Sequence, residues 1–340
     1  QSSHPTWNYH VNDAITMVDN LGANWLVFRP TWSLTNFTLP NFELLPSQDM
    51  FVYDLAMYGD KAHDLGLNVG LYPIPQFPVY PDQWWYESPR DFSWWVVWFE
   101  QYSQFILHHA EFAERHDISA IILGGDWVTP SLPEGTLVDG SPSGVPADAE
   151  SRWRTLIAQV RNSYQGELIW ALSYPDCINY YPPFINEFDK ILIHWSAALS
   201  STENHSVAEL YSEAARILDQ DILLFTQNTG TQIILGIEYP SAYASAIGCI
   251  PTWRGTCLPI GELTTTNPAI AEVGVDLQEQ VDLYNAMFLA VNERDWVAGL
   301  ISMGFYPPVT LQDPSISVYS KPASGVLWYW FPRLLSNPTE

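Results

Sequence analysis

Two acidic residues stand where apolar runs end, and their type and placement are the sequence's clearest chemical signal. Asp126 closes the run 120–125, and Glu238 closes the run 233–237. A pair of facing carboxyl groups can cleave a glycosidic bond, because one protonates the leaving oxygen while the other attacks the sugar or activates water. Taken singly, either acid could be a helix cap, a turn former or half of an ion pair. Because both acids directly follow an apolar run, the catalytic interpretation is favoured, with Asp126 as the general acid.

Aromatic and hydrogen-bonding residues occupy the ends of the other apolar runs. The chain has 16 Trp, 18 Tyr and 15 Phe, and the flat faces and polar edges of Trp and Tyr suit a stacked sugar ring. Most of these aromatic residues belong to the core in the simplest interpretation, and a lone histidine such as His194 is more often packed than catalytic. The candidate substrate-binding residues are Arg29, Trp32, Tyr72, Gln76, Trp127, Tyr174, His194, Trp195, Tyr239, Phe305 and Tyr306.

A regular series of elements must position these residues. Runs with strand character cover 24–30, 68–73, 119–126, 168–174, 190–197, 232–239 and 298–306. Segments with helical periodicity lie between them and include 99–116, 150–164, 207–224 and 277–293. This alternation predicts an α/β fold with a parallel sheet, and its length favours a closed (β/α)8 TIM barrel in one domain, 1–340. Catalytic groups in such barrels gather at the carboxyl ends of the strands, where both acids lie.

Composition excludes several other classes. The formal charge of −25, from 38 acidic against 13 basic residues, repels phosphate backbones and anionic lipids, so no nucleic acid or membrane partner is expected. No apolar run reaches the roughly 20 residues that span a bilayer. No glycine-rich phosphate loop follows the first strand, and no His, Asp and Glu set has metal-ligand spacing. We expect a carbohydrate partner, no cofactor and no metal, and the sequence leaves the oligomeric state open.

Three cysteines are too few for a disulfide scaffold or a zinc site. Cys249 and Cys257 flank a short loop and could form one bridge in an exported protein, or all three thiols, with Cys177, could stay reduced. Gln1 begins no recognisable signal peptide, so the chain is expected to be a mature or excised domain. We expect an extracellular or cell-surface location.

The chain resembles glycoside hydrolase family 113 of clan A, a (β/α)8 family known for β-mannanases. The resemblance runs over nearly the whole chain and is carried by 21–27 (LGANWLV), 65–73 (LGLNVGLYP), 99–127, 296–304 (WVAGLISMG) and 321–323 (KPA). It implies that Glu238 is the nucleophile at the end of the seventh strand. It also implies that Asp126 is the acid/base at the end of the fourth strand, where the family carries Glu after Gly-Thr or Gly-Asn.

This chain departs from the family pattern at three places. Asp126 is one methylene shorter than the family's Glu and follows two glycines, and residues 303–306 (MGFY) stand where tryptophans are usual. The family's first strand is not visible, so it either lies before Gln1 or is replaced by Thr6 to Tyr9. A shorter acid could widen a retaining separation of about 5.5 Å toward the inverting range near 6.5 Å, which leaves the stereochemistry open.

The resemblance implies a β-mannan or a related β-linked hexose polymer as substrate. The competing hypothesis is a carbohydrate-binding barrel that has lost catalysis, because binding needs only stacking and hydrogen bonds whereas hydrolysis needs both acids.

Overall fold

The computed structural model describes residues 7–260, 263, 268–307 and 312–336, with the side chains of a few of these residues left undescribed. Its main sheet has seven strands in the order β1-β4-β6-β7-β8-β9-β12, and the pairings recorded in it are parallel. All seven predicted strands are confirmed within a few residues of their expected ends. Their bounds are β1 (Trp25–Phe28), β4 (Asn68–Leu71), β6 (Ala120–Gly124), β7 (Glu167–Ser173), β8 (Lys190–Trp195), β9 (Gln232–Ile237) and β12 (Val297–Ser302).

By its internal contacts the chain divides into two compact units that interleave along the sequence. Unit 1 holds residues 1–8, 24–172 and 180–190, and unit 2 holds 9–23, 173–179 and 191–340. Asp126 belongs to unit 1 and Glu238 to unit 2. The single domain 1–340 stays a prediction.

Unit 1 combines the first four strands of the sheet with an aromatic core. Its helices are α2 (Val52–Asp64), α3 (Pro81–Glu87), α4 (Phe92–Arg115) and α5 (Ala149–Ser163), with 3-10 turns η1 (Asp126–Ser131) and η2 (Ile185–Glu187). A small sheet, in the order β3-β2-β5, consists of β2 (Thr31–Leu34), β3 (Phe42–Glu43) and β5 (Ile74–Gln76). The Asp91 side chain caps α4 by accepting the Trp94 N–H. The largest buried side chains of this unit include Trp84, Trp85, Trp95, Trp98, Trp153 and Trp170.

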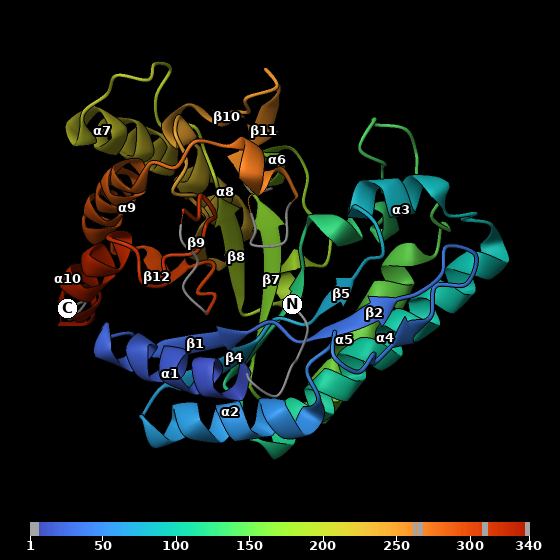
Figure 1. Ribbon diagram of the computed structural model, residues 1–340. Coiled ribbons are helices and arrows are strands. Elements are labelled where there is room, and N and C mark those ends of the chain that lie inside the picture. Colours follow the sequence, from blue (N-terminus) through green and yellow to red (C-terminus); the bar gives the residue numbers. More distant parts are fainter. Residues whose placement is uncertain (1–6, 261–262, 264–267, 308–311, 337–340) are drawn as a thin grey trace. The chain divides into compact units, whose positions relative to one another are not determined.

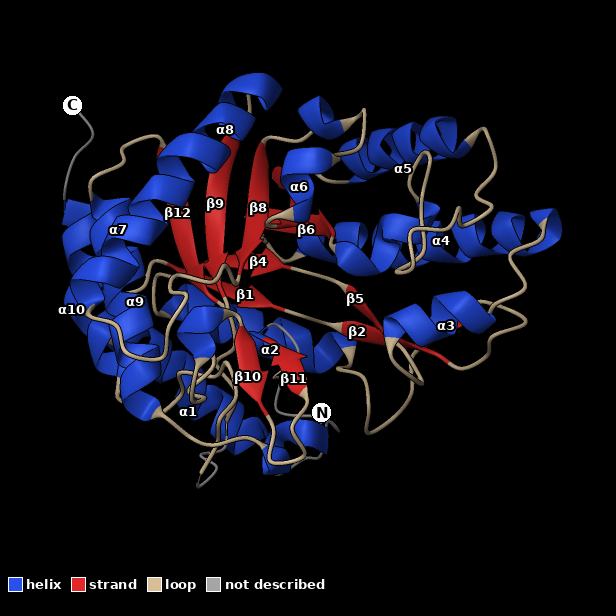
Figure 2. Ribbon diagram, turned by 90° about the horizontal axis from the view of Figure 1, so that it is seen from above, coloured by secondary structure: helices blue, strands red, loops and turns tan. Residues whose placement is uncertain are grey.

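In unit 2, the helices α7 (Val207–Ile217) and α9 (Leu277–Asn292) pack together, and α10 (Ala323–Ser336) packs on α9 (Figures 1 and 2). The predicted helix 207–224 runs on through η3 (Leu218–Ile222) and α8 (Leu223–Thr229). Other described elements of this unit are α6 (Asp176–Asn179), η4 (Ser245–Ile247), β10 (Cys249–Pro251), β11 (Cys257–Pro259) and η6 (Pro268–Glu272).

The first element of the described chain is a helix. α1 spans Trp7–Asn20, so the expectation that Thr6 to Tyr9 replaces the family's first strand is wrong for Trp7 to Tyr9, and Thr6 lies outside the described residues. The apolar positions Ala14, Ile15 and Val18 are buried at the three- and four-residue spacing of one helix face. The short polar segment before Ala14 contains none of these three positions, so the helical period could not be recognised in it.

Candidate active site

The turn that carries Asp126 depends on two glycines. Gly124 and Gly125 have φ angles of +85° and +104°, which disfavour residues with a side chain. A Cβ on Gly124 would lie 2.7 Å from the Trp170 ring, and one on Gly125 would lie 2.6 Å from the Tyr72 hydroxyl. Space and backbone conformation therefore both require glycine at these positions. The buried strand β6 ends in this turn, and Asp126 emerges from it as an exposed residue that begins η1.

Predicted binding residues of unit 1 surround this turn. The buried Tyr72 hydroxyl donates a hydrogen bond to the Gly124 carbonyl over 3.3 Å. The Arg29 guanidinium lies 5.5 Å from the centre of the Tyr72 ring, within cation–π range. Trp127 is half-buried, and its carbonyl accepts the Trp85 indole N–H over 2.8 Å. The structure thus brings Arg29, Tyr72 and Trp127 to the Asp126 turn, while their contact with substrate stays a prediction.

Two other candidates of unit 1 belong to the small sheet. Trp32 on β2 packs against α4, with its ring 4.9 Å from that of His108 and 5.5 Å from that of Phe105. Gln76 ends β5 and is exposed. His109 on the same helix is buried, and its Nδ1 atom lies 2.8 Å from the Phe105 carbonyl oxygen. Burial lowers the pKa of His109 to about 4.

Glu238 in unit 2 forms a short contact with a histidine. The Nδ1 atom of His194, on β8, lies 2.7 Å from Oε1 of Glu238, and the two side chains are only 12% and 14% exposed. The Glu238 backbone N–H donates to the Trp195 carbonyl over 3.1 Å, which fixes the chain where β9 ends. When Nδ1 carries a proton, His194 donates a hydrogen bond to the Glu238 carboxyl group, which holds that side chain in one orientation. Sequence reasoning named both residues but not their pairing.

The aromatic residues beside this pair mostly form the core of unit 2. Trp195 and Tyr239 are fully buried, and the Trp195 indole N–H donates to the Tyr239 hydroxyl over 2.9 Å. The Tyr239 hydroxyl in turn donates to the Ala197 carbonyl, and burial raises its pKa. Tyr174 is half-buried, stacks on Trp195 at 5.3 Å and donates its hydroxyl proton to Asp221. Of these three residues, Tyr174 has the most surface left for a ligand.

Two further candidates follow β12. Phe305 is half-buried and meets the Tyr319 ring edge-on at 5.0 Å. Tyr306 is also half-buried, and its backbone N–H donates to Ser317 Oγ over 3.1 Å. These contacts attach both residues to the loop that precedes α10.

A buried lysine that sequence reasoning did not assign to the site links this loop to the segment after Glu238. Lys321 is 8% exposed, and its Nζ donates to Ser241 Oγ over 2.8 Å and to the Ser315 carbonyl over 2.9 Å. Asp313 Oδ2 lies 3.3 Å from the same nitrogen. Burial lowers the pKa of Lys321 to about 8, against the opposing effect of Asp313.

Tyr284 on α9 is a second residue that the sequence did not reveal. It is fully buried, and its hydroxyl lies 3.0 Å from Ser302 Oγ and donates to the Ile237 carbonyl over 3.5 Å. Burial raises the pKa of Tyr284, and the negative charge of Glu238 adds to the effect. Tyr284 therefore supports the backbone immediately before Glu238.

The described residues also bear on three expectations from the sequence, which concern metal binding, membrane spanning and the pairing of the cysteines. In residues 7–260, 263, 268–307 and 312–336, no group of three or more His, Cys, Asp or Glu side chains could hold a metal ion. No helix in those same ranges is long and apolar enough to cross a membrane. Cys249 and Cys257, whose pairing the sequence left open, form a disulfide, and the Cys177 side chain is buried.

Comparison with known proteins gives a family and a fold. The model of Glycoside Hydrolase Family 113 matches residues 5–191, more than half of the chain, a range that includes Asp126 and ends before Glu238. No match was found among curated proteins.

Solved structures of similar fold include GH113 enzymes. A GH113 beta-1,4-mannanase, solved as a complex, is 20% identical, with a TM-score of 0.69 over 95% of this chain and 92% of the other. The GH113 beta-mannanase AaManA from Alicyclobacillus acidocaldarius is 19% identical, with a TM-score of 0.67 over 98% and 95%. A GH5_18 protein from Streptomyces cattleya is 14% identical, with a TM-score of 0.59 over 96% and 76%. These likenesses confirm the predicted (β/α)8 fold of the glycosidases.

Proposed function

Because the chain belongs to Glycoside Hydrolase Family 113 and is therefore a glycoside hydrolase with a carbohydrate substrate, we propose that it hydrolyses a β-1,4-linked mannan. Glu238 is the nucleophile and Asp126 the general acid and base. Support for the substrate comes from two GH113 mannanases whose structures have a similar fold. Support for the two roles comes from the position of each acid immediately after a strand, because barrel enzymes keep their catalytic groups there.

The observation that carries this proposal is the His194–Glu238 contact of 2.7 Å. A nucleophilic carboxylate must be ionised and held in one orientation. His194 holds the Glu238 carboxylate in one orientation when Nδ1 donates a hydrogen bond to Oε1, and the small exposure of the pair limits competition from water. An acid that served only as a cap or a surface charge would need no such partner.

The proposed reaction takes two steps and retains the configuration at the anomeric carbon of the sugar. A Glu238 oxygen bonds to the anomeric carbon while the bond to the leaving oxygen breaks and Asp126 gives that oxygen its proton. Water then attacks the same carbon, Asp126 takes a proton from the water, and the bond to Glu238 breaks. The turn at Gly124 and Gly125 sets the position of Asp126 and so provides the reach that this shorter acid needs.

The inactive-barrel hypothesis gains no support, since both acids are present and Glu238 has its histidine partner. The Cys249–Cys257 disulfide supports an oxidising compartment, and we propose an extracellular or cell-surface location on that ground.

Paired substitutions test the proposed chemistry. Asp126→Asn and Glu238→Gln should each lower kcat on β-mannan by roughly a thousandfold or more, because each removes a group that acts in the transition state. The exposed acids Asp60 and Asp295 provide matched controls, and Asn at either position should leave kcat unchanged. Turnover by Asp126→Asn or Glu238→Gln within tenfold of the parent would refute the assignment. Activity of the parent on α-linked glycans alone would refute the substrate.

A further inference from the structure

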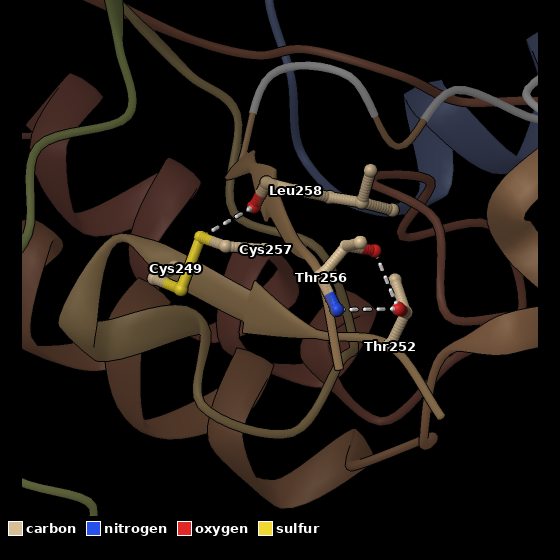
Figure 3. The surroundings of a disulfide bond; sticks show 5 residues. All are labelled: Cys249, Thr252, Thr256, Cys257 and Leu258. Carbon is tan, nitrogen blue, oxygen red and sulfur yellow. Dashed lines mark hydrogen bonds between the residues drawn. A yellow bond between two sulfur atoms is a disulfide. The ribbon is translucent and has the colours of Figure 1, made fainter. Parts of the chain in front are cut away.

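The segment that follows β9 and begins at Glu238 carries a β-hairpin. β10 and β11 pair in antiparallel register, with Ile250 opposite Leu258, and the Cys249–Cys257 disulfide joins the two strands (Figure 3). The hairpin belongs to unit 2, as does Glu238. In Figure 1 it lies in the upper part of the picture, above β8 and β9. Loops that follow barrel strands surround the active site, so the hairpin lies in the region of the chain where substrate contacts are built.

The tip of this hairpin is held in one conformation. The hydroxyl oxygens of Thr252 and Thr256 lie 2.7 Å apart, and the Thr256 N–H donates to the Thr252 hydroxyl over 3.3 Å (Figure 3). The Thr252 N–H also donates to the Thr256 carbonyl over 2.9 Å. Gly255 takes a φ of +78° in the turn between them, a conformation that glycine adopts readily. The disulfide and these bonds together reduce the freedom of a five-residue turn, so a side chain on it is pre-positioned for binding.

This tip presents a tryptophan to solvent. Trp253 is 72% exposed, and the Arg254 guanidinium lies 4.9 Å from its ring centre. Arg254 pairs with Glu272 over 2.8 Å, and the Trp253 N–H donates to the Glu272 carbonyl over 2.9 Å. The indole is therefore fixed through its backbone and braced by a cation, while most of its surface faces water. The apolar surface of this indole is therefore not buried in the folded protein and remains accessible to a ligand.

We propose that Trp253 is a stacking platform for a sugar ring of the polysaccharide, away from the bond that is cleaved. This inference rests on the proposed function, because that function supplies the glycan. A single indole matches one sugar ring in size, whereas a stable protein interface needs about 800 Å² from each partner. The next three residues of the turn, Arg254, Gly255 and Thr256, are exposed and offer polar groups, which fits a sugar better than an apolar protein surface.

Binding and turnover by matched variants test the platform. Trp253→Ala should weaken affinity for a long β-1,4-mannooligosaccharide by about fivefold or more, because it removes an aromatic ring that the bound sugar would cover. Affinity for the disaccharide and turnover of a short aryl mannoside should not change, because a short ligand does not reach the platform. Affinities are measured by calorimetry in a Glu238→Gln background, where the ligand is not consumed. The Trp253→Phe variant should retain most of the affinity, since it keeps an aromatic face.

Trp328 is the matched control, because it is 62% exposed on α10 and lies outside the hairpin. Trp328→Ala should bind both ligands like the parent, and equal melting temperatures exclude a folding defect in either variant. Unchanged affinity of Trp253→Ala for the long ligand, in a protein whose parent cleaves mannan, overturns the platform alone. Equal weakening for long and short ligands also overturns it. A parent that cleaves no glycan refutes the proposed function, and the platform falls with it.

Discussion

Gly125→Ala tests whether the turn before Asp126 sets the position of the acid. The native φ of +104° costs a residue with a side chain about 1–3 kcal/mol. The added Cβ would also lie 2.6 Å from the Tyr72 hydroxyl, and such overpacking typically costs about 1–3 kcal/mol more. The free energy of unfolding should therefore fall by roughly 2–6 kcal/mol, a large share of the typical 5–15 kcal/mol. Asp126 is the next residue, so a backbone shift of about 1 Å should lower kcat roughly a hundredfold.

Two companion variants separate backbone strain from the steric clash. Gly66 has a φ of +80°, and no neighbouring atom of the described residues lies within 4 Å of the point that an alanine methyl would occupy there. Gly66→Ala should therefore cost only about 1–2 kcal/mol and leave kcat unchanged. In a Tyr72→Phe background the hydroxyl is gone, so Gly125→Ala should cost less than it does in the parent. Some cost remains, because the Trp127 indole nitrogen lies 3.1 Å from the added Cβ.

Urea unfolding and steady-state rates on β-mannan measure these effects. The reasoning is refuted if Gly125→Ala is no less stable than Gly66→Ala, or if it loses stability and keeps full kcat. An equal cost of Gly125→Ala in the parent and in the Tyr72→Phe background would contradict the proposed clash with the hydroxyl.

Two further predictions concern Asp126 and Lys321. Asp126→Glu should lower kcat on β-mannan by roughly a hundredfold, because the turn already sets the reach for the shorter acid, and a faster variant would contradict this. Burial lowers the pKa of Lys321 to about 8 from its usual 10.5. Between pH 8 and pH 10.5 the unfolded chain therefore binds more protons at this lysine than the folded protein does. The contribution of Lys321 to the free energy of unfolding should for that reason rise with pH over this range. Urea unfolding of the parent and of Lys321→Met is measured at about pH 7 and about pH 10, and the stability of the parent relative to the variant should be greater at the higher pH. A lower relative stability of the parent at the higher pH would contradict a buried charge on Lys321.

The strands and main helices could be predicted from the sequence because their signals are local. Strand β6 is apolar along its whole length, as a strand covered on both faces must be, and Asp126 interrupts the pattern at its end. Glu238 follows β9 in the same way. A residue's position at a strand end follows from period and length, and the two acids could therefore be located without coordinates.

The contacts of the site could not be predicted because they join residues far apart in the chain. His194 and Glu238 are 44 positions apart, and nothing in either segment specifies which nitrogen meets which oxygen. Lys321 and Ser241 are 80 positions apart. Trp195 and Tyr239 were predicted as binding residues from type and place alone, and only packing reveals that both are fully buried.

The central claim, that Glu238 attacks the sugar while Asp126 supplies the proton, has one direct test. A 2-deoxy-2-fluoro β-mannoside with a good leaving group slows the second step, so the sugar stays attached to the nucleophile. Peptide mass spectrometry of the trapped protein should place the sugar on Glu238, and none should be found on the Glu238→Gln variant. A label on another residue, or no label in a protein that turns over mannan with inverted configuration at the anomeric carbon, would contradict the account.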